Sequence, residues 1–191
     1  MRSIYLKEIN SFFSSLIGYL VIGGFLLLLG LMLWIFPDNS ILESKFASLD
    51  ELFNVAPLVL MFLIPAITMR SFAEENQSGT IELLVTKPVA DWQIILAKFF
   101  ACLTLVVIAI LPTLVYYFSI YFLGSPVGNL DTGAIMGSYL GLVFLGSCFV
   151  AIGIFSSSLT KNQIVAFIIA TFMCFLFHWG FNYTSRIPVF I

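Results

Sequence analysis

Residues 99–123, FFACLTLVVIAILPTLVYYFSIYFL, form an apolar run that contains no charged residue. A helix needs about 20 apolar residues to cross a hydrocarbon core of about 30 Å. The run is too long, and alternates too weakly between apolar and polar residues, to be a strand of a membrane β-barrel, which has about 10 residues. It therefore predicts a membrane-spanning helix.

Further apolar runs lie on both sides of this one. Hydrophobic residues make up 61% of the chain and charged residues 9%, against about 45–50% and about 25% in soluble domains. A soluble fold with so few charges could not cover its surface with polar groups. We therefore expect an all-α fold, a polytopic helical membrane bundle with five spans. The expected spans lie near residues 16–36, 53–69, 99–123, 135–159 and 164–181.

Basic residues are concentrated on one side of these expected spans. The loop between the first two spans contains only Lys45 among several acidic residues. Basic residues favour the cytoplasmic side of a membrane, so we expect a cytoplasmic N-terminus and a cytoplasmic segment 70–98. The basic residues on that side are Arg2, Lys7, Arg70, Lys87, Lys98 and Lys161.

Residues 1–15, MRSIYLKEINSFFSS, are short, slightly basic and amphipathic. The apolar residues that can share part of one helical face are Ile4, Ile9, Phe12 and Phe13. Such a segment is typical of a helix that lies flat at the membrane interface. A frayed polar N-terminus is the alternative.

The sequence offers few groups for chemistry inside the membrane. No Asp, Glu, Lys or Arg lies well inside an expected span, which argues against an ion-driven transporter, a proton pump or an intramembrane enzyme. No catalytic residue, metal site or cofactor is predicted. A net charge of −2 gives no reason to expect a nucleic-acid partner. No P-loop is present, because no lysine precedes Ser or Thr after a glycine-rich turn. If the protein uses energy from ATP, a partner protein must supply it.

Residues 70–98, RSFAEENQSGTIELLVTKPVADWQIILAK, form a long polar connection between the second and third expected spans. The spacing Ser71-x-x-Glu74 fits a capping box, unless the helix simply continues from the second span. Gly79 tolerates a left-handed backbone, and Thr80–Thr86 offers a short amphipathic helix that Pro88 helps to end. This helix either folds back on the bundle or docks into a groove of a cytoplasmic protein. The residues alone leave both readings open.

This segment and the residues before it resemble ABC-2 type ABC transporter permeases. The lead-in PAITMRSFAEE, residues 65–75, is most similar to the gliding-motility-associated permease subunit of Bacteroidota, and to related copper-processing and multidrug permeases. That family has six spans with both ends cytoplasmic, so we expect a C-terminal sixth span to be missing from this chain. The residues that carry the resemblance are Glu75, Gly79, Thr80, Glu82, Leu83, Leu84, Pro88, Val89 and Lys98.

The resemblance implies a function for the whole chain. It implies an interfacial helix over residues 1–15 and an ABC-2 transmembrane domain over 16–191, in the bacterial inner membrane. This domain would be the permease subunit of an ATP-driven transporter and not itself an enzyme. Its implied partners are a separate ABC ATP-binding subunit, a second permease copy or related permease subunit, and membrane lipid. The residues implied to couple the permease to the ATPase are Glu74, Glu75, Gly79, Thr80, Glu82, Leu83, Leu84 and Pro88.

Two other functions stay open at this point. The chain could be a non-transporting scaffold or anchor of a motility or secretion complex. A membrane enzyme is the third reading, which the missing catalytic groups disfavour.

Overall fold

The computed structural model describes residues 1–36, 48–81, 90–124 and 128–184, and these residues form helices with no strand among them. The third apolar run is a helix, a short 3-10 turn at Leu111–Thr113 and a second helix. The helices are α1 (Arg2–Phe13), α2 (Leu16–Trp34), α3 (Asp50–Thr68), α4 (Arg70–Ser78), α6 (Asp91–Ile110), α7 (Leu114–Leu123), α8 (Thr132–Ser158) and α9 (Gln163–Thr184).

Within these residues, 5 helices are long and apolar enough to cross a membrane. They are α2, α3 continued by α4, α6 continued by α7, α8, and α9. The expected fold class, a polytopic helical bundle, is confirmed. The third spanning helix begins at Asp91, ahead of the apolar run that starts at residue 99. Apolar content marks the part of a helix that lipid surrounds, whereas the backbone continues as a helix into polar residues beyond it.

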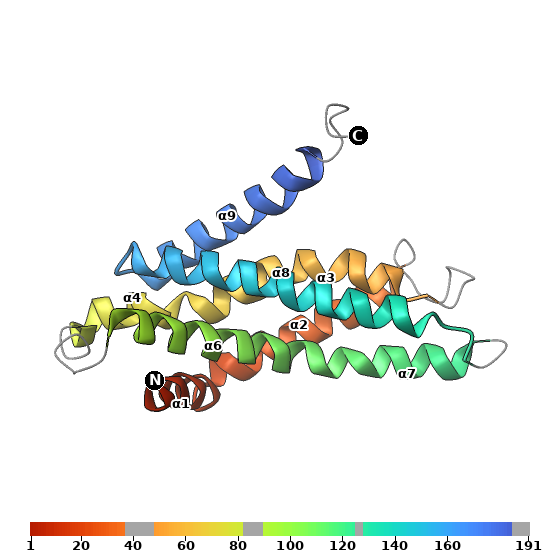
Figure 1. Cartoon of the computed structure of the whole chain (residues 1–191), viewed down its shortest axis with the longest axis horizontal. Helices are drawn as coiled ribbons and strands as arrows, with labels where there is room; N and C mark the ends of the chain where they lie inside the picture. The colour runs from red at the N-terminus through yellow and green to blue at the C-terminus, as the bar shows by residue number, and fades with distance from the viewer. Residues whose placement is uncertain (37–47, 82–89, 125–127, 185–191) are drawn as a thin grey trace.

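Helix α1 lies across the long axis of the bundle, and Figure 1 shows it end-on beside α6 and α2. The predicted N-terminal helix is therefore present, while its place at a membrane surface stays a prediction. Ser15 separates it from α2: the Ser15 hydroxyl accepts a hydrogen bond from the Ile17 N–H at 3.3 Å. This N-cap lets the chain turn from the transverse helix into the first span.

Helix α3 is the centre of the bundle and packs against α2, α8 and α9. Leu60 and Ile64 of α3 are fully buried, as is Val150 of α8. The backbones of α3 and α8 approach closely at Gly153, where a Cβ atom would collide with the side chain of Thr68. Small residues allow such close packing in lipid, where no hydrophobic force drives helices together.

Helix α9 contacts the other helices through one narrow face and diverges from them along its length (Figure 1). The buried residues of this face, Ala166, Ala170 and Cys174, are small. The opposite face exposes large apolar side chains such as Ile168 and Phe172, as expected for a helix surrounded by lipid.

Candidate functional site

Helix α4 prolongs the second spanning helix beyond its apolar part. Met69 joins α3 to α4 with helical backbone angles, and no side chain caps the start of α4. The capping box at Ser71 is therefore not formed, and the alternative reading, continuation of the helix, is confirmed. The helix ends at Gly79, whose φ of 71° is left-handed as predicted. Glycine adopts this conformation without the steric penalty that a Cβ atom brings.

The junction between α3 and α4 is held by a serine from α8. The Ser157 hydroxyl accepts hydrogen bonds from the backbone N–H groups of Phe72 and Ala73, each at 3.0 Å. It donates to the Met69 carbonyl at 3.0 Å. Because Ser157 is fully buried, these bonds do not compete with water, and they fix the start of α4 on α8.

The inner side of α4 faces a buried lysine at the start of the third span. The Lys98 side chain is 0% exposed, and its Nζ lies 2.8 Å from Glu8 Oε1 and 2.9 Å from Glu75 Oε2. It also donates to the Ser71 carbonyl and lies 4.8 Å from the centre of the Phe72 ring. A buried ammonium group is stable only when it is paired in this way.

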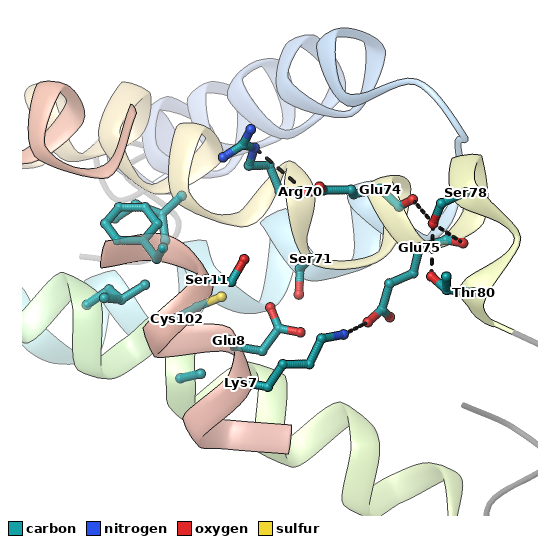
Figure 2. Close-up of a pocket in the computed structure, with 14 residues that line it drawn as sticks. Lys7, Glu8, Ser11, Arg70, Ser71, Glu74, Glu75, Ser78, Thr80 and Cys102 are labelled. Carbon is teal, nitrogen blue, oxygen red and sulfur yellow. Dashed lines mark hydrogen bonds and ion pairs between the residues drawn. The ribbon is translucent and has the colours of Figure 1, made fainter. Parts of the chain in front are cut away.

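A second lysine completes the group. Lys7 Nζ donates to Glu75 Oε1 at 2.8 Å, and this hydrogen bond raises the pKa of Lys7 above its ordinary value, although partial burial opposes the effect. Figure 2 shows Lys7 and Glu8 extending from α1 toward Glu75 on α4. We call Lys7, Glu8, Glu75 and Lys98 the charge cluster. It joins α1, α4 and α6 beside a cavity of about 170 Å³.

The outer side of α4 and its end are exposed and polar. Glu74 has a side chain that is 55% exposed and lies 3.8 Å from Arg70. Ser78, Gly79 and Thr80 follow, all exposed, with the Ser78 and Thr80 hydroxyls 2.9 Å apart. Of the implied coupling residues, the structure brings Glu74, Gly79 and Thr80 together on this surface.

The other implied coupling residues are not part of that surface. Glu75 turns inward to the charge cluster, with a side chain only 10% exposed. The four remaining residues implied to contact the ATPase lie outside the residues that the structure describes. They are Glu82, Leu83, Leu84 and Pro88.

Sequence reasoning missed the charge cluster. Lys98 is named above as a basic residue beside a span and as part of the ABC-2 resemblance, without an expected partner, and Glu8 is not singled out at all. The available signal is that Lys98 stands between apolar neighbours, Ala97 and Phe99. A lysine in such a run needs an acidic partner unless its end reaches water. In the described part of the chain, no three His, Cys, Asp or Glu residues are placed to hold a metal ion.

Comparisons with known proteins support the ABC-2 permease part of the resemblance drawn from the sequence. The sequence model of the family described as "ABC-2 family transporter protein" matches residues 3–184. The chain is 29% identical over 139 residues to the "Probable multidrug ABC transporter permease YbhR" of Escherichia coli (strain K12), and equally to its namesake in Escherichia coli O157:H7. That match covers 69% of this chain and 36% of the relative, so the chain spans about a third of the relative's length. No solved structure matches it.

Proposed function

The chain belongs to the ABC-2 transporter family, and we propose that it is the permease subunit of an ATP-driven ABC transporter. It would carry an unidentified substrate across the bacterial inner membrane, with its N-terminus and α4 in the cytoplasm. A separate ATP-binding subunit would supply the energy. A second permease copy or a related permease subunit would complete the transmembrane part.

The form of α4 is the observation that carries this proposal. It is a polar extension of the second span whose outer side and end are exposed, while its inner side is fixed to α6 and α8. A protein that presses on the exposed end of α4 moves the second span with it. Glu74, Gly79 and Thr80 form the described part of the proposed ATPase contact, which would continue through residues 82–88.

Glu75 has a different task within this proposal. Its carboxylate faces Lys7 and Lys98, so it acts on the ATPase contact by holding α4 in position. The resemblance of residues 65–75 to the gliding-motility-associated permease further suggests a role in gliding motility, and this role stays a prediction.

The test is to look for a gene for a P-loop ATPase with the ABC signature beside the gene of this chain, and to produce the two proteins together. We expect the two proteins to co-purify, and ATP hydrolysis by the complex in lipid nanodiscs to differ from that of the ATPase alone. Gly79→Val and Glu82→Gln should each remove this difference, while membrane insertion is unchanged. Gly137→Val, at the far end of α8 where nothing would contact an added Cβ atom, is the control.

A non-transporting scaffold gives the opposite result. If no ABC ATPase binds the chain, or if hydrolysis is the same with and without it, the transporter proposal is wrong.

A further inference from the structure

We infer that the charge cluster makes α1 a moving part of the transporter, because it fastens this transverse helix to the helix that meets the ATPase. A displacement of α4 would then move α1 and α6 together with the second span. The inference rests on the proposed function and goes beyond it, since it assigns Lys7, Glu8 and Lys98 as positioning residues.

The ion pairs of the cluster form a closed triangle of three helices. Lys7 joins α1 to α4 through Glu75 at 2.8 Å. The same carboxylate joins α4 to α6 through Lys98 at 2.9 Å. Lys98 joins α6 back to α1 through Glu8 at 2.8 Å. Two consecutive residues of α1 with opposite charges therefore hold two different helices.

Burial makes two sides of the triangle strong. Lys98 is 0% exposed and its partners Glu75 and Glu8 are 10% and 20% exposed, so water and salt screen these pairs weakly. Lys7 is 59% exposed, and its pair is correspondingly weaker. If α4 moved without its neighbours, Lys98 would lose Glu75 and keep only Glu8, and the buried Glu75 carboxylate would lose both of its lysines, which is strongly unfavourable. The lower free energy is reached when the three helices move together.

Further contacts lead from the triangle to the first span. Tyr5 of α1 shares a hydrogen bond with Thr104 of α6 at 2.9 Å. Arg70, the first residue of α4, donates to the Ser15 hydroxyl at 3.2 Å, and Ser15 caps α2. A displacement of α4 therefore reaches the start of α2 both directly and through α1.

A static anchor is the alternative role for α1. In that case α1 keeps its position in the membrane while α4 moves, and the ion pairs only stabilise the resting fold. The two roles differ in what happens to α1 when the ATPase closes on ATP.

The experiment measures two distances in the permease–ATPase complex in lipid nanodiscs by pulsed electron resonance. Spin labels are placed on exposed Gln77 of α4 or exposed Ser3 of α1, each paired with a label on exposed Met136 at the far end of α8. Exposed Cys148 is replaced by Ala so that it takes no label. ATP with vanadate traps the closed ATPase. We expect both distances to shift in the wild-type complex.

The decisive variant is Lys7→Gln/Glu8→Gln. It removes both ion pairs of α1, keeps the net charge, and leaves the Glu75–Lys98 pair intact. We expect the shift at position 77 to remain and the shift at position 3 to be lost. The control Arg2→Gln changes an exposed charge of α1 outside the cluster and should leave both shifts in place.

Each other result has a definite meaning. If only the distance from position 77 changes in the wild type, α1 is a static anchor and the inference is wrong. If the distance from position 3 still changes in the double variant, other contacts move α1 and the inference is also wrong. If position 77 does not shift in the wild type, the proposed coupling through α4 fails instead. A double variant that does not reach the membrane is replaced by Glu8→Gln alone, for which we expect a reduced shift at position 3; an unchanged shift counts against the inference.

Discussion

Replacing Lys98 by Met removes one ammonium group from the charge cluster and keeps a flexible side chain of similar length. The variant leaves Glu8 without the partner that lies 2.8 Å away. It also removes one of the two lysines that contact Glu75, and the donor to the Ser71 carbonyl.

The expected loss of stability follows from what each partner keeps. Removing one member of a buried ion pair costs about 3–5 kcal/mol. Glu75 keeps Lys7 at 2.8 Å, and Glu8 is 20% exposed and can reach water, so the loss should lie at the low end, about 3 kcal/mol. Adding Glu8→Gln removes the unpaired carboxylate. The remaining loss should then fall to about 1–2 kcal/mol, since hydrogen bonds are lost but no buried charge is left alone.

The assay is reversible unfolding in mixed detergent micelles, followed by circular dichroism. Lys161→Met, at an exposed lysine between α8 and α9, is the matched control and should stay within about 0.5 kcal/mol of the wild type. If Lys98→Met is as stable as this control, or if the double variant is less stable than the single one, Lys98 is not held by these carboxylates and the reasoning is refuted.

Three further substitutions test how the helices around α4 are held. Gly153→Ala places a methyl group against Thr68 of α3 and should lower the free energy of unfolding by about 1–3 kcal/mol in the same assay. Gly137→Ala has open space around the added methyl group and should not destabilise the protein. Ser157→Ala removes three hydrogen bonds at the α3–α4 junction. It should lower the free energy of unfolding by about 1–3 kcal/mol and speed amide exchange at the start of α4. Ser158→Ala loses only a hydrogen bond within its own helix and should have neither effect. Gly79→Ala should cost about 1–2 kcal/mol, measured by exchange of the last amides of α4, because a side chain disfavours the left-handed backbone, while Gly79→Asn should cost less.

The spanning helices could be predicted from the sequence because apolar content is a local property. Each apolar run needs only its own residues to be recognised, and all five runs became helices. Their ends could not be predicted equally well. The third helix starts at Asp91, ahead of its apolar run, because nothing in residues 91–98 breaks a helix.

The backbone of Gly79 was predictable for the same local reason, whereas the direction of Glu75 was not. Which way this side chain points depends on whether α4 continues α3 without a change of phase, and the Ser71 spacing allowed both. The continuous helix puts Ser71 and Glu75 on one inward face, one turn apart.

The charge cluster depends on contacts between distant parts of the chain. Glu8 and Lys98 are separated by 90 positions, and Lys7 and Glu75 by 68. No periodic pattern links residues so far apart, and although Lys98 stands out among apolar neighbours, nothing in the sequence identifies its partners. Only the packing of α1 across α6 and α4 brings them together.

The pairing of these charges bears on the lipids that the protein needs. Amphipathic helices with free basic residues bind anionic headgroups with about 1 kcal/mol per residue, and they release them as salt rises. Here Lys7 of α1 contacts a glutamate of the same chain, as do Arg70 and Lys98 on the neighbouring helices. Their charges are already compensated, which leaves exposed Arg2 as the basic side chain of α1 outside the charge cluster. We therefore expect α1 to keep its place in bilayers of purely zwitterionic lipid and at high ionic strength, conditions under which a helix that depends on anionic headgroups would leave the surface.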